Sequence, residues 1–166
     1  MANKLDNLIR KYLSGDADSF DQIYEETKKG VYLSIYQIIP NRSVIEDLMQ
    51  DTYLKVIDSI NSYQMGTNFT AWVCKIARNN ALNYYNKNSK IEYVDAYENE
   101  SIFGSNNQTP LLDHALSILE GKEKEIFTYH IVLGYKFKDI AKILEINMKT
   151  AFYLYKKAIN KIKEQI

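Results

Sequence analysis

Between Asp58 and Glu92 the chain has no acidic residue, although the whole chain has as many acidic as basic residues, 21 of each. The same stretch is rich in cations, aromatic residues and asparagines. Lysine and arginine bind phosphates, amide groups bond to base edges, and aromatic faces stack on unpaired bases. This combination predicts a surface that binds a nucleic acid. A solvated helix whose aromatic residues belong to a core would show the same pattern.

Helical spacing explains how this stretch presents those groups. From Phe69 onward the apolar residues recur every three or four positions, which predicts one buried stripe. That stripe consists of Phe69, Trp72, Val73, Ile76 and Ala77. The opposite face carries Lys75, Arg78, Asn79, Asn83 and Asn86. Thr67 or Asn68 is expected to cap the start of this helix.

The preceding segment predicts an amphipathic helix with an acidic outer face. Ser43 and Glu46 have the spacing of a capping box at its start. The outer face presents Glu46, Asp47, Gln50, Asp51 and Lys55. Such a face is either simply solvated or a docking surface for a basic partner. Asp47 and Asp51 lie one turn apart, but no third ligand completes a metal site.

The C-terminal part predicts a helix-turn-helix. A short helix from Phe137 to Leu144 precedes a turn at residues 145–147, and Asn147 can cap a longer basic helix. Ala141 is small enough for the two helices to cross closely, and Ile146 fills the turn. The outer stripe of the last helix is Lys149, Tyr153, Lys156, Lys157 and Asn160. Helical hairpins with basic ends also occur outside DNA-binding proteins.

We therefore expect an all-α fold of two small helical domains joined by an acidic linker. The expected boundaries are residues 1–90 for the first domain, 91–109 for the linker and 110–166 for the helix-turn-helix domain, where Thr109 and Pro110 form a strong helix start. Residues 91–113 carry five acidic and no basic residues, whereas residues 114–166 carry 10 basic and six acidic ones. The net charge of zero is unlike that of a nonspecific DNA coat protein.

Several function classes lack the residues that they need. The chain has no phosphate-cradling glycine loop and no Cys/His metal constellation, and His114 and His130 have no evident nucleophile beside them. We therefore expect no enzyme activity, no metal and no cofactor. The one cysteine, Cys74, fits packing in a reducing cytoplasm. The first residues do not resemble a signal peptide, and no apolar run reaches membrane-span length.

Three segments in this order resemble a known family. They are DLMQDTYLKV at residues 47–56, NFTAWVCKIARNNALNYYNK at residues 68–87 and IFTYHIVLGYKFKDIAKILEINMKTAFYLYKKA at residues 126–158. The chain is similar to alternative RNA polymerase sigma factors of the extracytoplasmic-function (sigma-70) family. The chain departs from the family pattern at Glu145, where the turn usually has glycine, and at Phe152 and Leu154, where arginine is frequent.

The resemblance implies a factor for promoter-specific transcription initiation that makes no bonds itself. It implies that the first domain docks on the β′ coiled coil of core RNA polymerase and melts the −10 element, while the second binds the −35 element on the β flap. An anti-sigma factor is a further implied partner. The implied polymerase-binding residues are Asp47, Leu48, Gln50, Asp51 and Tyr53. The implied −10 residues are Tyr63, Asn68, Lys75, Arg78, Asn79 and Asn83. The implied −35 residues are Lys149, Thr150, Tyr153, Lys156 and Lys157.

Two other function classes remain open from the residues alone. A helix-turn-helix regulator would bind DNA without polymerase, and a small helical adaptor would bind polymerase and leave promoter DNA untouched. A small helical enzyme lacks a catalytic constellation. Transcription with purified core polymerase separates these classes, because only a sigma factor starts transcripts at a specific promoter.

Overall fold

The computed structural model describes residues 3–88 and 110–165, and every regular element in these ranges is helical. The all-α prediction is therefore confirmed. The chain divides into two compact units, the first with helices α1 to α4 and the second with helices α5 to α8. The expected linker at residues 91–109, and Thr109 with it, lies outside the described residues.

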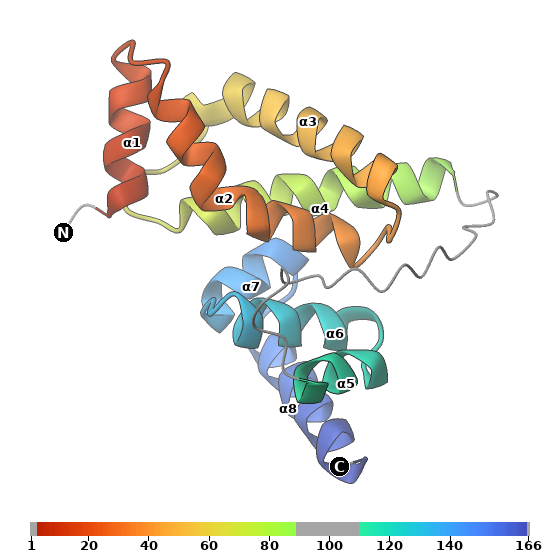
Figure 1. The fold of residues 1–166 in the computed structure, drawn as a ribbon. Helices are drawn as coiled ribbons and strands as arrows, with labels where there is room; N and C mark the ends of the chain where they lie inside the picture. The colour runs from red at the N-terminus through yellow and green to blue at the C-terminus, as the bar shows by residue number, and fades with distance from the viewer. Residues whose placement is uncertain (1–2, 89–109, 166) are drawn as a thin grey trace. The chain divides into compact units, whose positions relative to one another are not determined.

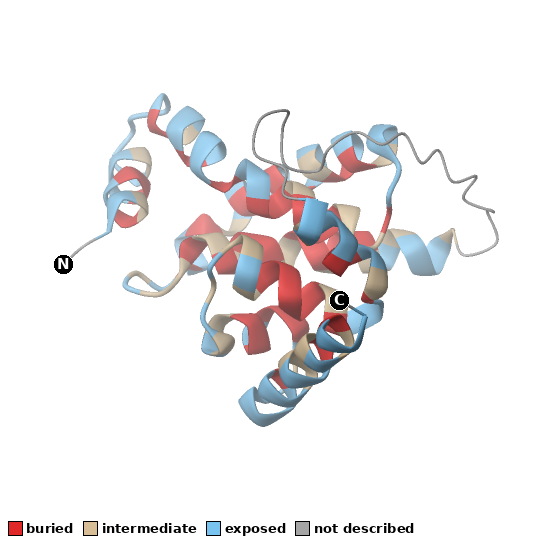
Figure 2. Cartoon of the chain, turned by 60° about the horizontal axis from the view of Figure 1, so that its bottom comes forward, coloured by how far each residue is buried: buried red, intermediate tan, exposed pale blue. Residues whose placement is uncertain are grey.

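The first unit is built around its fourth helix. Its elements are α1 (Lys4–Leu13), α2 (Ser19–Tyr36), α3 (Arg42–Ser59), the short helix η1 (Ile60–Ser62) and α4 (Phe69–Lys87). Helix α4 packs against both α2 and α3, and α1 packs against α2 (Figure 1). The buried residues of the unit form one continuous core to which all four helices contribute. Figure 2 shows these buried positions along the sides of the helices that face their neighbours.

Asparagine caps three of the four helices of this unit. The side chains of Asn3, Asn41 and Asn68 each accept a hydrogen bond from a backbone N–H in the first turn that follows. The prediction that Asn68 caps α4 is confirmed. The capping box at Ser43 and Glu46 is wrong, because α3 begins two residues earlier. The Ser43 hydroxyl instead donates to Oδ1 of Asn41, 3.0 Å away.

The second unit contains α5 (Pro110–Ile118), α6 (Gly121–Phe127), η2 (Thr128–Val132), α7 (Phe137–Leu144) and α8 (Met148–Glu164). The sequence predicts one helix from about Lys122 to Leu133, but the structure has an α-helix followed by a π-helical turn. The helical period of the apolar residues does not distinguish the two, because a π turn shifts the register by only one residue. Gly134, with a φ of 72°, ends this segment where the sequence predicts it.

The helix-turn-helix forms at the predicted residues, although its turn lacks glycine. Glu145 follows α7 with φ 55° and ψ 44°, the left-handed conformation that favours glycine. Its N–H donates to the carbonyl of Ala141, and the N–H of Ile146 donates to the same oxygen. Asn147 then caps α8 through Thr150, at 2.8 Å. The turn is thus fixed by its backbone bonds and by the cap.

An ion cluster joins α6 to α8 in the same unit. Glu123 is 7% exposed, and its carboxylate lies 3.2 Å from the ammonium of Lys157 and 2.7 Å from that of Lys161. Burial by itself raises the pKa of Glu123, but the hydrogen bonds and charges of Lys161 and Lys157 outweigh it, so that the pKa is lowered. The charged carboxylate therefore stabilises the folded second unit.

The lowered pKa makes this stabilisation depend on pH. It is fully present above the unfolded value of 4.5 and is lost as the pH falls through the lower folded value. We expect Glu123→Gln to lower the thermal unfolding midpoint at pH 7. We also expect this midpoint to fall less steeply in the variant as the pH is lowered. Circular dichroism melts from pH 3 to 7 measure both. Glu120→Gln, at an exposed position three residues away, is the control. Identical melts for the two variants would contradict the assignment.

Candidate nucleic-acid interface

The open side of α4 carries cationic and amide side chains. Lys75 and Asn79 are partly exposed and Asn83 and Asn86 are exposed, so these four predicted residues follow one side of the helix. Trp72, predicted in the buried stripe, instead lies on the same side as these residues and is only half-buried, with its ring centroid 5.5 Å from that of Phe69. The open side thus offers ammonium, amide and aromatic groups together, which is the chemistry of a single-strand surface.

Two residues of the predicted nucleic-acid set are buried. Tyr63 and Arg78 are each 7% exposed. The sequence placed Arg78 on the outer face, and that placement is wrong. The error arises because α2 and α3 together cover more than one stripe of α4, so that the buried arc extends to Arg78. In this conformation neither side chain presents a surface to DNA, and both support the packing of the unit.

The loop from Tyr63 to Asn68 leads into the open side of α4. The Tyr63 ring packs edge-on against Phe69 and also contacts Trp72, with centroid distances of 4.9 and 5.6 Å. Burial raises the pKa of the Tyr63 hydroxyl, which stays protonated and lies 2.6 Å from the carbonyl of Thr67. The side-chain oxygen of Asn68 accepts from the N–H of Ala71 as the helix cap, at 3.1 Å. Tyr63 and Asn68 therefore shape the loop.

The predicted acidic face of α3 is open to solvent. Asp47, Gln50 and Asp51 are exposed, whereas Leu48 and Tyr53 are buried and hold the helix in place. The Tyr53 hydroxyl lies 2.8 Å from the hydroxyl of Thr27 on α2. Burial raises the pKa of Tyr53, so this hydroxyl also stays protonated.

One apolar residue of α3 was missed by the sequence reasoning. Leu54 is 61% exposed, and it lies about one turn after Asp51, on the same side of the helix. Leu54 therefore places an exposed apolar side chain beside the carboxylate of Asp51. The signal in the sequence was a leucine at an outer position of the helical period.

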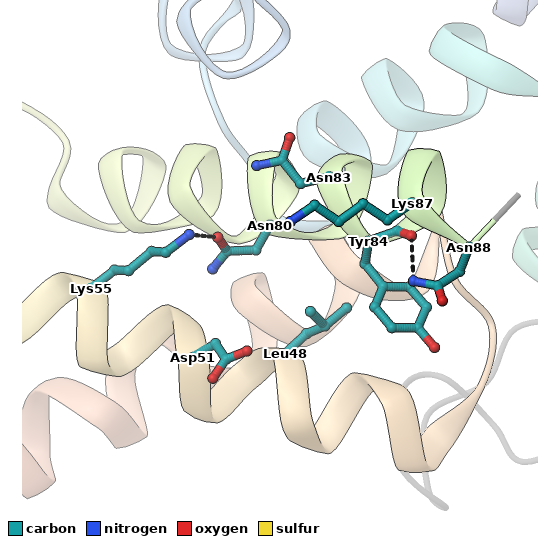
Figure 3. Close-up of a pocket in the computed structure, with 8 residues that line it drawn as sticks. All are labelled: Leu48, Asp51, Lys55, Asn80, Asn83, Tyr84, Lys87 and Asn88. Carbon is teal, nitrogen blue, oxygen red and sulfur yellow. Dashed lines mark hydrogen bonds between the residues drawn. The ribbon is translucent and has the colours of Figure 1, made fainter.

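A polar hollow of about 220 Å³ opens between α3 and α4. Figure 3 shows the side chains of Lys55 and Asn80 reaching toward each other from the two helices. Eight residues line it: Leu48, Asp51, Lys55, Asn80, Asn83, Tyr84, Lys87 and Asn88. The hollow brings predicted polymerase residues, Leu48 and Asp51, beside the predicted DNA residue Asn83. From the sequence alone, these residues were expected to belong to two separate sites.

A chain of hydrogen bonds forms the floor of this hollow. The Lys55 ammonium donates to Oδ1 of Asn80, and the Asn80 amide donates to the Thr52 hydroxyl at 3.1 Å. Thr52 in turn donates to the carbonyl of Leu48 at 2.7 Å. Asn80 is 6% exposed and Thr52 is fully buried. The burial of Asn80 could not be predicted from the sequence, because an asparagine within an asparagine-rich stretch gives no signal of burial.

The outer side of α8 carries most of its predicted residues. Lys149, Thr150, Tyr153 and Lys156 are exposed near the start of the helix. Lys156 lies with its ammonium 4.9 Å from the centre of the Phe152 ring, in a cation–π contact. Lys157 is also exposed, and its ammonium lies 3.2 Å from the Glu123 carboxylate. Its contact with DNA stays a prediction, and the ion pair within the unit competes for its ammonium. Tyr155 packs edge-on against Phe137 and His130, as expected for an inward position.

Within the described ranges, no group of three or more His, Cys, Asp and Glu side chains is placed to hold a metal ion. No helix in residues 3–88 or 110–165 has both the length and the apolar character needed to cross a membrane. Cys74 is buried in α4, as predicted.

Both units match models of known protein regions. Residues 23–91 match Sigma-70 region 2, and residues 110–162 match Sigma-70, region 4. The fold and these two matches thus define a class of helical transcription proteins that are built from two units. The chain belongs to the sigma-70 family, among its extracytoplasmic-function members.

Individual relatives agree with this class. The chain is 28% identical over 150 residues to the ECF RNA polymerase sigma factor BldN of Streptomyces coelicolor, covering 82% of this chain and 56% of BldN. It is 27% identical over 88 residues to the ECF RNA polymerase sigma factor SigW of Bacillus subtilis, covering 53% of this chain and 47% of SigW. The chain thus spans about half the length of these two relatives.

A solved structure shares the fold. The sigma factor RpoE of Bartonella quintana, crystallised with the anti-sigma factor NepR, aligns with a TM-score of 0.67 at 24% identity. The alignment covers 87% of this chain and 94% of RpoE.

Asn80 and Asn83 lie three residues apart on α4, and we expect that changing each to alanine affects stability to very different extents. Asn80→Ala removes the buried partner of Thr52 and Lys55, which lowers the free energy of unfolding by about 1–3 kcal/mol. Asn83→Ala changes an exposed side chain, so its effect on stability stays within about 0.5 kcal/mol. Urea titrations followed by circular dichroism measure both. Equal stabilities would refute the structural assignment of Asn80.

Proposed function

We propose that this protein is a sigma factor that binds core RNA polymerase and directs transcription initiation at specific promoters. The observation that carries the proposal is the order of its parts. A unit matching region 2, with an acidic face on α3 and an acid-free face on α4, precedes a unit matching region 4 that contains a helix-turn-helix. Polymerase supplies the chemistry of bond formation, and this chain supplies binding and positioning.

The α3 face is the proposed dock for the β′ coiled coil. Asp47, Gln50 and Asp51 offer two carboxylates and an amide to basic residues of the partner. Leu54, about one turn beyond Asp51, adds an exposed apolar side chain that the partner can cover.

The loop before α4 and the open side of α4 form the proposed −10 site. Once the duplex opens, the loop captures an unpaired base, Asn79 and Asn83 meet base edges, and Lys75 holds a phosphate. These roles suit the exposed polar side chains of α4. Since Arg78 and Tyr63 are buried, they take no direct part in this proposal.

The start of α8 is the proposed −35 reader, placed on the β flap. Lys149 and Lys156 hold phosphates, while Thr150 and Tyr153 contact base edges or thymine methyl groups. Without arginine on this face, bidentate contacts to guanine are absent, and we expect a −35 element that tolerates A and T.

The proposal has two further parts, a partner and a location. RpoE was crystallised with an anti-sigma factor, and we propose an anti-sigma partner for this chain as well. A protein that works on core polymerase acts in the cytoplasm, which is the proposed location.

Transcription with purified components tests the whole proposal. Core polymerase mixed with this protein is expected to start transcripts at discrete sites in genomic DNA, and mapped start sites give the −10 and −35 elements. Promoter binding without polymerase, and no new transcripts, would instead identify a helix-turn-helix regulator.

The docking face gives a sharper prediction. We expect Asp51→Lys to weaken binding to core polymerase by about 2 kcal/mol or more, because truncating one side of a partly buried charge pair costs about 2–5 kcal/mol. Asp21→Lys makes the same charge change at an exposed position of α2 and serves as the control. Affinity is measured by titrating labelled protein with core polymerase. Equal affinities for the two folded variants would remove α3 from the interface.

The α8 face gives a prediction about salt. Each phosphate contact contributes about −0.9 to the slope of log K against log salt concentration. Changing both Lys149 and Lys156 to alanine should therefore flatten the slope for promoter binding by holoenzyme by up to roughly two units. Lys157→Ala should leave the slope nearly unchanged and lower stability, because its ammonium pairs with Glu123. An unchanged slope in the double variant would argue that α8 does not hold DNA.

A further inference from the structure

A buried carboxylate in α1 is not used by any site described so far. Asp6 is 2% exposed, and its N–H donates to Oδ1 of Asn3, the cap of α1, at 2.7 Å. Burying a carboxylate is costly unless hydrogen-bond donors surround it. The groups that donate hydrogen bonds to the Asp6 carboxylate therefore indicate its role.

Those donors come from the loop that precedes α4, about 60 positions later in the chain. The backbone N–H of Gly66 donates to Oδ2 of Asp6 at 2.9 Å. The Tyr63 hydroxyl lies 3.2 Å from Oδ1 of Asp6 and 2.6 Å from the Thr67 carbonyl, so its one proton is shared between two acceptors. Hydrogen bonds to an ionised acceptor are roughly twice as strong as neutral ones. Asp6 thus ties the loop to α1, beside which the loop runs in Figure 1.

The loop needs such an attachment because its own backbone is irregular. Gly66 has a φ of 85°, in the left-handed region, and no atom of a neighbour lies within 4 Å of the position that a Cβ would take. A side chain at position 66 would thus find nothing to pack against, although the neighbouring Met65 contacts the core. At the two ends, Tyr63 is packed by Phe69 and Asn68 caps α4. Asp6 fixes the part between them.

We infer that Asp6 is a positioning residue for −10 recognition: it holds the Tyr63–Asn68 loop in the shape that captures an unpaired base. The inference rests on the proposed function, because it assigns to α1 the control of a loop that the proposal places at the −10 element. The match to region 2 begins at residue 23, so α1 lies outside it. A segment before the matched region then sets how the promoter strand is held.

Three variants separate positioning from stability. Asp6→Ala removes both loop contacts. Asp6→Asn keeps both loop contacts. The side-chain oxygen of the asparagine can accept from the N–H of Gly66, and its amide N–H can donate to the Tyr63 hydroxyl oxygen. The Tyr63 hydroxyl then donates its proton to the Thr67 carbonyl alone. Thr27→Val removes a buried hydrogen bond of the same unit, between Thr27 and Tyr53, and leaves the loop intact. It is the control for a general loss of stability.

The experiment measures how holoenzyme binds single-stranded oligonucleotides of the non-template strand. Their sequence comes from the promoter mapped with this protein, and an abasic nucleotide replaces each −10 position in turn. For the natural protein, loss of the captured base should weaken binding about tenfold or more. In Asp6→Ala the loss of affinity caused by the abasic nucleotide should fall to about twofold, and only at the position of the captured base. The affinity of this variant for core polymerase should be unchanged. Asp6→Asn and Thr27→Val should keep the full penalty.

The outcomes are distinguishable. A full penalty in Asp6→Ala overturns the inference but leaves base capture by the natural protein intact. If the natural holoenzyme shows no penalty at any −10 position, base capture itself is refuted and the inference falls with it. If Asp6→Ala does not fold, Tyr63→Phe takes its place: it keeps the ring and the Gly66 bond, and it should reduce the penalty about threefold. A full penalty in Tyr63→Phe then overturns the inference.

Discussion

Helix α4 has to satisfy two environments along its whole length, and the first unit is arranged around that constraint. One arc of the helix is covered by α2 and α3, while the other stays open with lysine and asparagine side chains. Small residues on the covered arc allow two helices to approach it at once; Ala71, Cys74, Ala77 and Ala81 are all buried there. The packing on both sides fixes the direction of the open arc, so that any surface for nucleic acid inherits its geometry from the core.

Directional polar contacts then fix the register of the packed helices. Apolar packing tolerates small shifts between helices, whereas a buried hydrogen bond is lost when its partners move apart. Thr52 and Asn80 connect α3 to α4, Thr27 and Tyr53 connect α2 to α3, and Asp6 connects α1 to the loop before α4. Each connection joins residues at least 26 positions apart in the sequence, and two of the three lie beside surfaces with a proposed function.

The second unit meets the same need with charges. Glu123 on α6 holds two lysines of α8, which fixes the helix that carries the proposed −35 residues. This explains why adjacent lysines have different roles. Lys156 lies over an aromatic ring at the surface, whereas Lys157 turns toward the buried carboxylate. In the turn of the helix-turn-helix, Glu145 takes the left-handed conformation that favours glycine.

The sequence by itself determined the helical class, the start of α4, the asparagine cap of α8, and the residues that form the helix-turn-helix. These follow from local rules, namely the period of the apolar residues and the chemistry of helix ends. It also identified the acidic face of α3, because exposure of a carboxylate is readable from one helix alone. The tertiary structure decided which side chains of α4 face inward. Arg78 and Asn80 are polar, and only the presence of two covering helices buries them. It likewise decided that Asp6 meets Gly66 and that Lys157 meets Glu123, since a hydrogen bond or ion pair between distant residues leaves no periodic trace in a single sequence.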